Sequence, residues 1–259
     1  MAHKPRKRLG QNFLQDTMYQ QRIANSIRLK EGAKCIEIGP GQGAITAHLL
    51  DRFGAVEAVE IDRDLVRLLG RKFSKQGLSI HQQDVLSLDF KQLADGKRLS
   101  IIGNLPYNIS SPLLFQLMES IEVIDEMVFM LQKEVVDRIT APPGSKTYGR
   151  LSVTTGLLLN SEKLFNVPPG AFFPVPKVMS SVIKLWPKEN AEIPAGFDKT
   201  LFAQIVKAAF SQRRKTIRNA LSKLISEQQL IEWGVNPKAR AEQLDIETYK
   251  LMAVKLGAV

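Results

Sequence analysis

Strand-like apolar runs alternate with helical segments from residue 34 to residue 139, and this alternation limits the possible folds more than any other feature of the chain. The strand-like runs lie at 34–39, 55–62, 78–84, 99–107 and 126–134. The segments at 44–53, 63–73 and 112–120, which separate most of these runs, place their apolar residues at helical spacing. Parallel strands need such crossovers, and the helices then cover both faces of the sheet. The pattern therefore predicts an α/β domain with a mostly parallel sheet, and further strands are expected at 150–159 and 180–187.

A change in composition divides the chain near residue 187. The stretch 187–196 is typical of a linker, since it combines two prolines, a glycine and charged residues. Beyond it, residues 202–210 carry apolar side chains at helical spacing, and the tail to residue 259 also has a helical pattern. We therefore predict an α/β domain at 1–187, beginning with a basic N-terminal arm at 1–30, and a small all-helical domain at 197–259.

Basic residues outnumber acidic ones by 36 to 26, which gives a formal net charge of +10 at pH 7. The excess is gathered in two places. Residues 1–30 hold seven basic residues and one acid, and residues 207–223 hold six basic residues and no acid. Two such clusters favour nucleic acid as a partner, touched at two places, over the alternative of a charged face that is merely solvated.

Cysteine, histidine and hydropathy patterns exclude several classes of protein. The single cysteine, Cys35, rules out an intramolecular disulfide, and the scattered His3, His48 and His81 lack the spacing of metal ligands, so no metal site is expected. No apolar stretch follows the basic start as in a signal peptide, and none approaches membrane-spanning length. The expected location is the cytoplasm, with no membrane partner.

A glycine-rich turn, "EIGPGQG", follows the first strand and contains Gly39, Gly41 and Gly43. Glycine here lets the backbone pass close to a ligand and lets the next helix pack on the sheet. Glu60 ends the second strand, where a carboxylate accepts both hydroxyls of a ribose, and Asp84 ends the third, where it could bind an adenine amino group. Each acid alone fits a helix cap or a solvated turn. Together with the glycines, they predict an adenosine-containing ligand at the carboxyl edge of the sheet.

The fourth strand ends on Asn104-Leu105-Pro106-Tyr107. An exocyclic amine such as adenine N6 is a poor nucleophile, because its lone pair is delocalised into the ring. Two acceptors aimed at its N–H groups favour a more tetrahedral nitrogen: the Asn104 side-chain oxygen and the Leu105 carbonyl, whose direction Pro106 fixes. Tyr107 offers a ring on which the base stacks, contributing roughly 1–3 kcal/mol. An amine held in this way needs an activated methyl donor, and S-adenosylmethionine fits because its adenosine suits the strand-end acids.

Five blocks of the chain, in order, resemble the ribosomal RNA adenine dimethyltransferase family. They are "KRLGQNFL" (7–14), "EIGPGQGAIT" (37–46), "NLPYNIS" (104–110), "FFPVPKVMSSV" (172–182) and "FSQRRKTIRNAL" (210–221). The resemblance covers almost the whole chain, although Met179 stands where a small polar or acidic residue is typical. It implies a Rossmann-like class I methyltransferase domain followed by a helical RNA-binding domain.

The resemblance also implies roles for particular residues. Contacts with S-adenosylmethionine are implied for Asn12, Leu14, Gly39, Glu60, Asp84 and Asn104, with Gln11 beside them. Catalytic roles are implied for Asn104, Leu105, Pro106, Tyr107 and Phe172. Phe172 matches the family's second stacking aromatic, and its neighbour Phe173 stays open as an alternative. RNA contacts are implied for Arg213, Arg214, Lys215 and Arg218.

The implied activity is dimethylation of N6 on two adjacent adenosines in the 3′-terminal hairpin loop of small-subunit (16S) ribosomal RNA. The implied setting is assembly of the 30S subunit, with a monomeric enzyme as the default. One alternative is a resistance-type methylase acting on large-subunit RNA, against which the "GQNFL" opening and the basic helical tail argue. Another is an assembly factor that keeps the fold without catalysis, which the intact Asn-Leu-Pro-Tyr tetrad disfavours.

Overall fold

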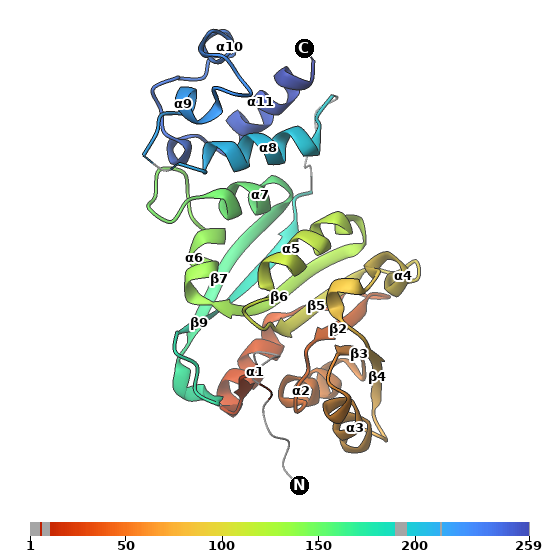
Figure 1. Cartoon of the computed structure of the whole chain (residues 1–259). Helices are drawn as coiled ribbons and strands as arrows, with labels where there is room; N and C mark the ends of the chain where they lie inside the picture. Colours follow the sequence, from red (N-terminus) through yellow and green to blue (C-terminus); the bar gives the residue numbers. More distant parts are fainter. Residues whose placement is uncertain (1–5, 7–10, 190–195, 213, 259) are drawn as a thin grey trace. The chain divides into compact units, whose positions relative to one another are not determined.

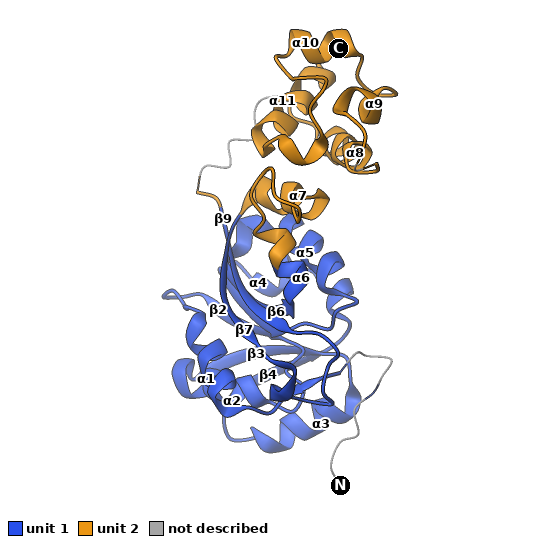
Figure 2. Ribbon diagram, turned by 90° about the vertical axis from the view of Figure 1, so that its left-hand side faces the viewer, with its two compact units in different colours: residues 1–136, 160–187 blue, residues 137–159, 188–259 orange. Residues whose placement is uncertain are grey.

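The computed structural model of the protein describes residues 6, 11–189, 196–212 and 214–258 (Figure 1). The chain forms two compact units (Figure 2). Unit 1 consists of Met1–Val136 and Asn160–Pro187, and unit 2 consists of Asp137–Leu159 and Lys188–Val259. Residues 137–159 were predicted to belong to the first domain, but they pack with the C-terminal helices in unit 2. Within the described part of the chain, no helix has the length and apolar character needed to span a membrane.

Unit 1 is built on a seven-stranded sheet in the order β4-β3-β2-β5-β6-β9-β7. Neighbouring strands from β4 to β6 are parallel, whereas β9 is antiparallel to β6. The strands span Lys34–Ile38 (β2), Ala55–Glu60 (β3), Gly77–Gln82 (β4), Leu99–Asn104 (β5), Ile124–Gln132 (β6), Leu159–Val167 (β7) and Ser180–Pro187 (β9). The prediction of an α/β fold with a mostly parallel sheet is confirmed.

Helices on both sides of this sheet bury its apolar side chains. They are α1 (Thr17–Ser26), α2 (Ala44–Phe53), α3 (Arg63–Lys72), α4 (Phe90–Ala94) and α5 (Ser110–Glu119). One core cluster joins Ile23 of α1 and Leu49 of α2 to the sheet residues Val56, Ile102 and Val128. Figure 2 shows α5 on the other side of the sheet from α1 and α2. Strand and helix alternate because parallel strands must all start at the same edge of the sheet. Each helix carries the chain back to that edge before the next strand begins.

A short two-stranded pairing lies outside the main sheet and was not predicted. Strand β1 (Phe13–Leu14) runs antiparallel to β8 (Phe172–Phe173), with Phe13 opposite Phe173 and Leu14 opposite Phe172. The backbone N–H of Gln15 also donates to the Ala171 carbonyl at 2.8 Å. These contacts bring the N-terminal segment beside a segment more than 150 residues away in the sequence.

The strand predicted at 150–159 is wrong, because residues Arg150–Leu158 form helix α7. Its β-branched residues favoured a strand, but the Thr154 and Thr155 hydroxyls donate to the Arg150 and Leu151 carbonyls one turn back, at 2.8 and 2.7 Å. This side-chain bonding lets threonine fit a helix, and packing against α8 (Lys199–Ala209) and α11 (Ile246–Gly257) then outweighs strand propensity. Strand β7 begins only at Leu159.

Unit 2 is helical, as the C-terminal part was expected to be. Besides α7 it contains α8 (Lys199–Ala209), α9 (Ile217–Leu221), α10 (Glu227–Glu232) and α11 (Ile246–Gly257), and helix α6 (Lys133–Ile139) leads the chain into it. The Phe210 ring lies 6.2 Å from that of Tyr148 and 5.9 Å from that of Tyr249. These aromatic contacts join the loop before α7 to α8 and α11 in one core. Most of the expected linker, residues 190–195, lies outside the described residues.

Candidate active site

A cavity of about 240 Å³ opens at the carboxyl ends of β2, β3 and β5 in unit 1. The strand order reverses at this point: β3 and β4 lie on one side of β2, whereas β5 and β6 lie on its other side. Open α/β sheets bind their ligands at such a switch point. The volume is far above what a water molecule needs, so the cavity suits an organic ligand.

Ten residues singled out from the sequence line this one cavity. They are Asn12, Leu14, Gly39, Glu60, Asp84, Asn104, Leu105, Pro106, Tyr107 and Phe172. The structure therefore brings the expected donor-binding and base-binding residues together, although what each of them binds stays a prediction. Gln11 lines the cavity as well.

The glycine turn between β2 and α2 shapes the floor of the cavity. Gly41 has a φ of 59° and Gly43 a φ of 77°, values that L residues rarely adopt. A Cβ atom on Gly41 would lie 3.1 Å from Cδ1 of Phe13, and one on Gly43 would lie 2.5 Å from Cε2 of Phe73. The first glycine lets the N-terminal segment close over the turn, and the second lets α2 pack against α3.

The two strand-end acids are held differently. Glu60 is buried and accepts backbone N–H groups from Gly41 at 3.3 Å and from Asp62 at 2.9 Å. Burial is the main cause that raises its pKa above the ordinary value, with the Asp62 charge adding to the effect. Asp84 is exposed, and its Oδ1 accepts the Leu86 N–H at 3.0 Å. The helix-cap role considered for Asp84 thus exists, and it coexists with a place in the cavity wall.

Glu37, on β2, is a cavity residue that the sequence analysis missed. Its carboxyl group is buried and accepts the Thr46 hydroxyl at 2.6 Å. Burial raises the pKa of Glu37 to about 7, and the Glu60 charge acts in the same direction. The signal was present in the sequence, because an acid inside an otherwise apolar strand is unusual.

Replacing Glu37 with glutamine should remove a pH dependence of folding. Since the pKa of Glu37 is raised in the folded protein, that protein binds more protons than the unfolded chain between about pH 4.5 and 7. Wild-type stability therefore falls as pH rises through this window, by roughly 3 kcal/mol from this group. Urea unfolding of both proteins at pH 5 and pH 8 measures the effect. The variant should gain on the wild type only at pH 8, and an equal offset at both values would contradict the assignment.

The tetrad at the end of β5 lines the cavity. The Asn104 side-chain nitrogen donates to the Asn12 carbonyl at 3.0 Å. This bond fixes which end of the side-chain amide is the nitrogen and which is the oxygen. The Leu105 N–H donates to the Met130 carbonyl of β6 at 3.2 Å, and the Pro106 carbonyl accepts the Ile109 N–H at 3.1 Å. The backbone of the tetrad is thus fixed by the neighbouring strand β6 and by the turn after it. An amide oxygen and a nearby carbonyl held in this way suit a bound amine.

Two aromatic rings stand at the same cavity. The Tyr107 hydroxyl lies 3.4 Å from the Ser180 hydroxyl, which holds the ring to β9. Phe172 is only 4% exposed and lines the cavity, whereas Phe173 is 54% exposed and is absent from its wall. Consecutive residues of a strand face opposite sides, so only one of the two phenylalanines can face the ligand. Burial and the cavity wall favour Phe172 as the ring that faces the ligand.

The charge of the cavity fits a cationic ligand. Among the described residues that line it are three carboxyl groups, those of Glu37, Glu60 and Asp84, and no lysine, arginine or histidine. S-adenosylmethionine carries a sulfonium and an ammonium group, and its adenosine needs acceptors for hydroxyl and amino hydrogens. The residues present therefore fit it. No group of three or more His, Cys, Asp or Glu within the described ranges could hold a metal ion.

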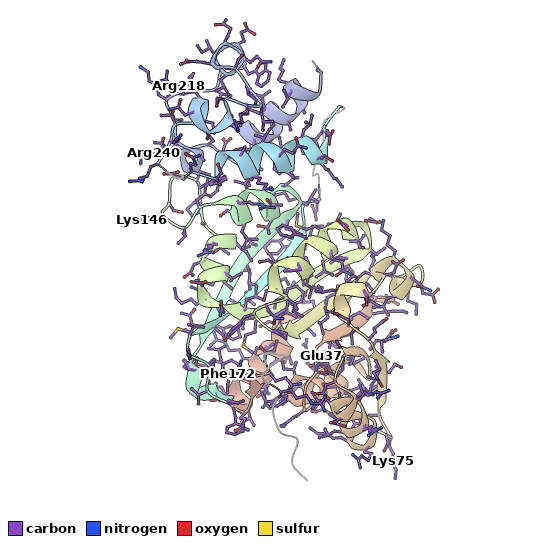
Figure 3. All side chains as sticks on the ribbon, viewed as in Figure 1. Glu37, Lys75, Lys146, Phe172, Arg218 and Arg240 are labelled. Carbon is purple, nitrogen blue, oxygen red and sulfur yellow. The ribbon has the colours of Figure 1, made fainter. Side chains whose placement is uncertain are left out.

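The basic residues expected to touch RNA belong to unit 2. Arg214 and Lys215 are exposed, Arg218 forms an ion pair with Glu227 at 3.0 Å, and Arg213 lies outside the described residues. Thr216 forms a bridge with Arg240, which brings this arginine beside the basic run. Arg218 and Arg240 project from the same edge of unit 2 (Figure 3). Arg240 was missed because more than twenty residues separate it from the run.

Comparison with known proteins gives consistent matches along the chain. Residues 2–256 match the family model described as ribosomal RNA adenine dimethylase. The ribosomal RNA small subunit methyltransferase A of Thiobacillus denitrificans is 48% identical over 255 residues, covering 98% of this chain and 99% of that protein. Its namesake from Pseudomonas aeruginosa is 46% identical over 257 residues, covering 98% and 96%.

Solved structures agree in fold. A dimethyladenosine transferase from Plasmodium falciparum superposes with a TM-score of 0.79 at 24% identity, covering 95% of this chain and 98% of that one. The 23S rRNA methyltransferase ErmE superposes with a TM-score of 0.75 at 25% identity, covering 94% and 100%. Both units of the chain therefore have counterparts in solved proteins.

Proposed function

The chain belongs to the ribosomal RNA adenine dimethylase family, and we propose that it transfers methyl groups from S-adenosylmethionine to N6 of adenosines in small-subunit ribosomal RNA. Two adjacent adenosines in the 3′-terminal hairpin loop are the target, each receiving two methyl groups. The observation that carries this proposal is the Asn-Leu-Pro-Tyr tetrad, which lies at one cavity with three carboxyl groups and Phe172. The residues proposed to bind the amine and those proposed to bind the cationic donor therefore line the same cavity.

The methyl donor, when bound, supplies an electrophilic methyl group on a positively charged sulfur. The chain's own part is to hold the acceptor nitrogen. The Asn104 oxygen and the Leu105 carbonyl accept its two N–H groups, which draws the lone pair out of conjugation with the ring. No strong base is needed, because the nitrogen loses its proton after attack. Catalysis is therefore mainly positioning, which contributes up to about 7–11 kcal/mol in well-oriented systems.

The rings of Tyr107 and Phe172 hold the adenine taken out of its stack. Stacking on such rings contributes roughly 1–3 kcal/mol for each base. Extruding a nucleotide costs a few kcal/mol, least where the base is already in a loop. Stacking on the two rings offsets that cost. Because the cost is least for a base in a loop, a hairpin loop is a suitable target.

Purified ribosomal subunits lacking the modification distinguish the proposed substrate from its alternative. The protein is incubated with radiolabelled S-adenosylmethionine and with either small or large subunits. Label should enter only the small-subunit RNA, and mass mapping should find it on two neighbouring dimethylated adenosines. Label in large-subunit RNA would replace this function with that of a 23S methylase. Binding without transfer would leave an assembly factor.

The basic edge of unit 2 is proposed to bind the same RNA through its phosphates. Arg214, Lys215 and Arg218 from the sequence analysis, with Arg240 beside them, make up this edge. Arg213, which was also expected to bind RNA, lies outside the described residues. Arg218 also pairs with Glu227. The exposed Arg214 and Lys215 are therefore the sharper test.

Replacing Arg214 and Lys215 together with glutamine should weaken RNA binding at every salt concentration. Removing a phosphate-binding charge makes the dependence of log affinity on log salt shallower, so the slope should fall in magnitude by about 1.5 for the pair. Filter binding of the hairpin RNA between low and moderate salt measures this. A matched control is Lys75→Gln with Lys97→Gln, which removes two exposed charges from unit 1. An unchanged slope in the unit 2 variant would show that Arg214 and Lys215 belong to an ordinary solvated surface.

Three finer points belong to the same proposal: the substrate is the immature 30S subunit, the enzyme acts as a monomer, and it acts in the cytoplasm. The family membership and the basic edge support the first. Light scattering of the purified protein checks the second, with 29.0 kDa expected for one chain. Cell fractionation checks the third, and co-sedimentation with precursor rather than mature 30S particles checks the first.

A further inference from the structure

Arg6, Gln11 and Asp62 form a closed triangle of polar contacts beside the cavity. A guanidinium nitrogen of Arg6 lies 3.1 Å from Oδ1 of Asp62. The backbone N–H of Arg6 donates to the Gln11 side-chain oxygen at 2.8 Å. The Gln11 side-chain nitrogen completes the triangle by donating to Oδ2 of Asp62 at 3.2 Å. Each member therefore contacts the other two.

Asp62 is the buried corner of this triangle. Its side chain is 0% exposed, and a buried carboxylate persists only when cations and hydrogen bonds compensate its charge. Its Oδ1 also accepts the Asp64 N–H at 3.0 Å, and its own backbone N–H donates to Glu60 at 2.9 Å. Asp62 thus contacts both the guanidinium group of Arg6 and the carboxyl group of Glu60, the acid proposed to bind the ribose.

Gln11 is the corner that belongs to the cavity wall. It lines the cavity with Asn12, whose carbonyl accepts the Asn104 side chain at 3.0 Å. Residues 11–14, all of which line the cavity, form its N-terminal wall. The triangle connects this wall to the end of β3, and the bond between Asn12 and Asn104 connects it to the end of β5. Neither connection involves contact of Arg6 itself with the cavity, since Arg6 is not among its lining residues.

We propose that Arg6 is a positioning residue for the methyl donor: through Asp62 and Gln11 it keeps the N-terminal wall closed against Glu60 and Asn104, so donor affinity depends on it. This inference rests on the proposed function, because it takes S-adenosylmethionine as the ligand. It also departs from the sequence analysis, which counted Arg6 among the arm residues available to a polyanion. In the structure the Arg6 guanidinium is paired with the carboxylates of Asp62 and Asp64.

Calorimetric titration of the full chain with S-adenosylmethionine, without RNA, tests the proposal. Arg6→Gln removes a charge-assisted contact to a buried carboxylate, so the Kd for the donor should rise roughly tenfold. In the transfer assay KM for the donor should rise in parallel, while kcat at saturating donor and KM for RNA stay within about twofold of wild type. Arg6→Lys keeps the charge and should recover part of the affinity.

Arg22→Gln is the matched control, because it removes the same charge from the same basic segment. Arg22 lies on α1 with its guanidinium 3.8 Å from the centre of the Phe165 ring, and it does not line the cavity. Its donor affinity should equal that of wild type. A rise in KM for RNA with unchanged donor affinity in Arg6→Gln would overturn the proposal and make Arg6 an RNA contact.

A double variant keeps the test decisive if Arg6→Gln alone folds poorly. Asp62→Asn removes the buried charge, so adding Arg6→Gln to it should cost no further donor affinity. An additional tenfold loss in the double variant would overturn the proposal, since Arg6 would then act independently of Asp62. The wild-type titration separates the two failures: no donor binding there contradicts the proposed function, whereas equal binding by wild type and Arg6→Gln contradicts only the role of Arg6.

Discussion

Replacing Asn104 with alanine should lower kcat for methyl transfer by about 10²–10³-fold, the range found when one preorganised polar group is removed from a reacting centre. The Asn104 oxygen is one of only two acceptors proposed for the target amine, and alanine offers none. RNA affinity should stay near that of wild type, because the proposed phosphate contacts belong to unit 2. Single-turnover assays at saturating donor, with filter binding of the RNA, measure both quantities.

Asn104→Asp separates the two ends of the side chain. Aspartate keeps an oxygen for the amine but lacks the N–H that holds the Asn12 carbonyl at 3.0 Å. We therefore expect kcat to recover at least tenfold over the alanine variant. KM for the donor should be raised in both variants, because neither side chain can donate to the Asn12 carbonyl. Equal kcat in the wild type and the alanine variant would contradict the mechanism.

Most of the site could be located from the sequence, because the geometry of parallel sheets is regular. Residues that follow the carboxyl ends of neighbouring parallel strands must meet at one edge, so Gly39, Glu60, Asp84 and Asn104 could be grouped from their positions alone. The structure places all four on one cavity. Glu37 escaped only because it lies inside a strand rather than at its end.

The rest depends on contacts between distant segments, which no local pattern encodes. Asn12 and Leu14 reach the cavity because β1 pairs with β8 and because Asn12 contacts a side chain 92 residues away. Their place was implied by family resemblance and not by periodicity. The same limit explains α7, where packing outweighed strand propensity, and Arg240, which a backbone bridge brings to Thr216.

Replacing Phe172 with leucine should lower kcat/KM for RNA by about 10–100-fold, the effect of removing one stacking ring. Leucine is the sharper substitution because Phe172 also belongs to the apolar core of unit 1. Alanine would leave a cavity there and cost about 3–5 kcal/mol of stability, which would obscure the catalytic effect. With leucine the core stays filled, so the lower activity reports on the ring.

Phe173→Leu is the matched control, since the neighbouring residue carries the same side chain, is 54% exposed and does not line the cavity. We expect its kcat/KM to stay within about twofold of wild type, because surface substitutions without such contacts have small effects. Fluorescence of a 2-aminopurine placed at the target position should be quenched on binding by the wild type and by Phe173→Leu, and less by Phe172→Leu. If the two variants exchange these behaviours, the base stacks on Phe173, and the strand β8 presents its outer face to the RNA.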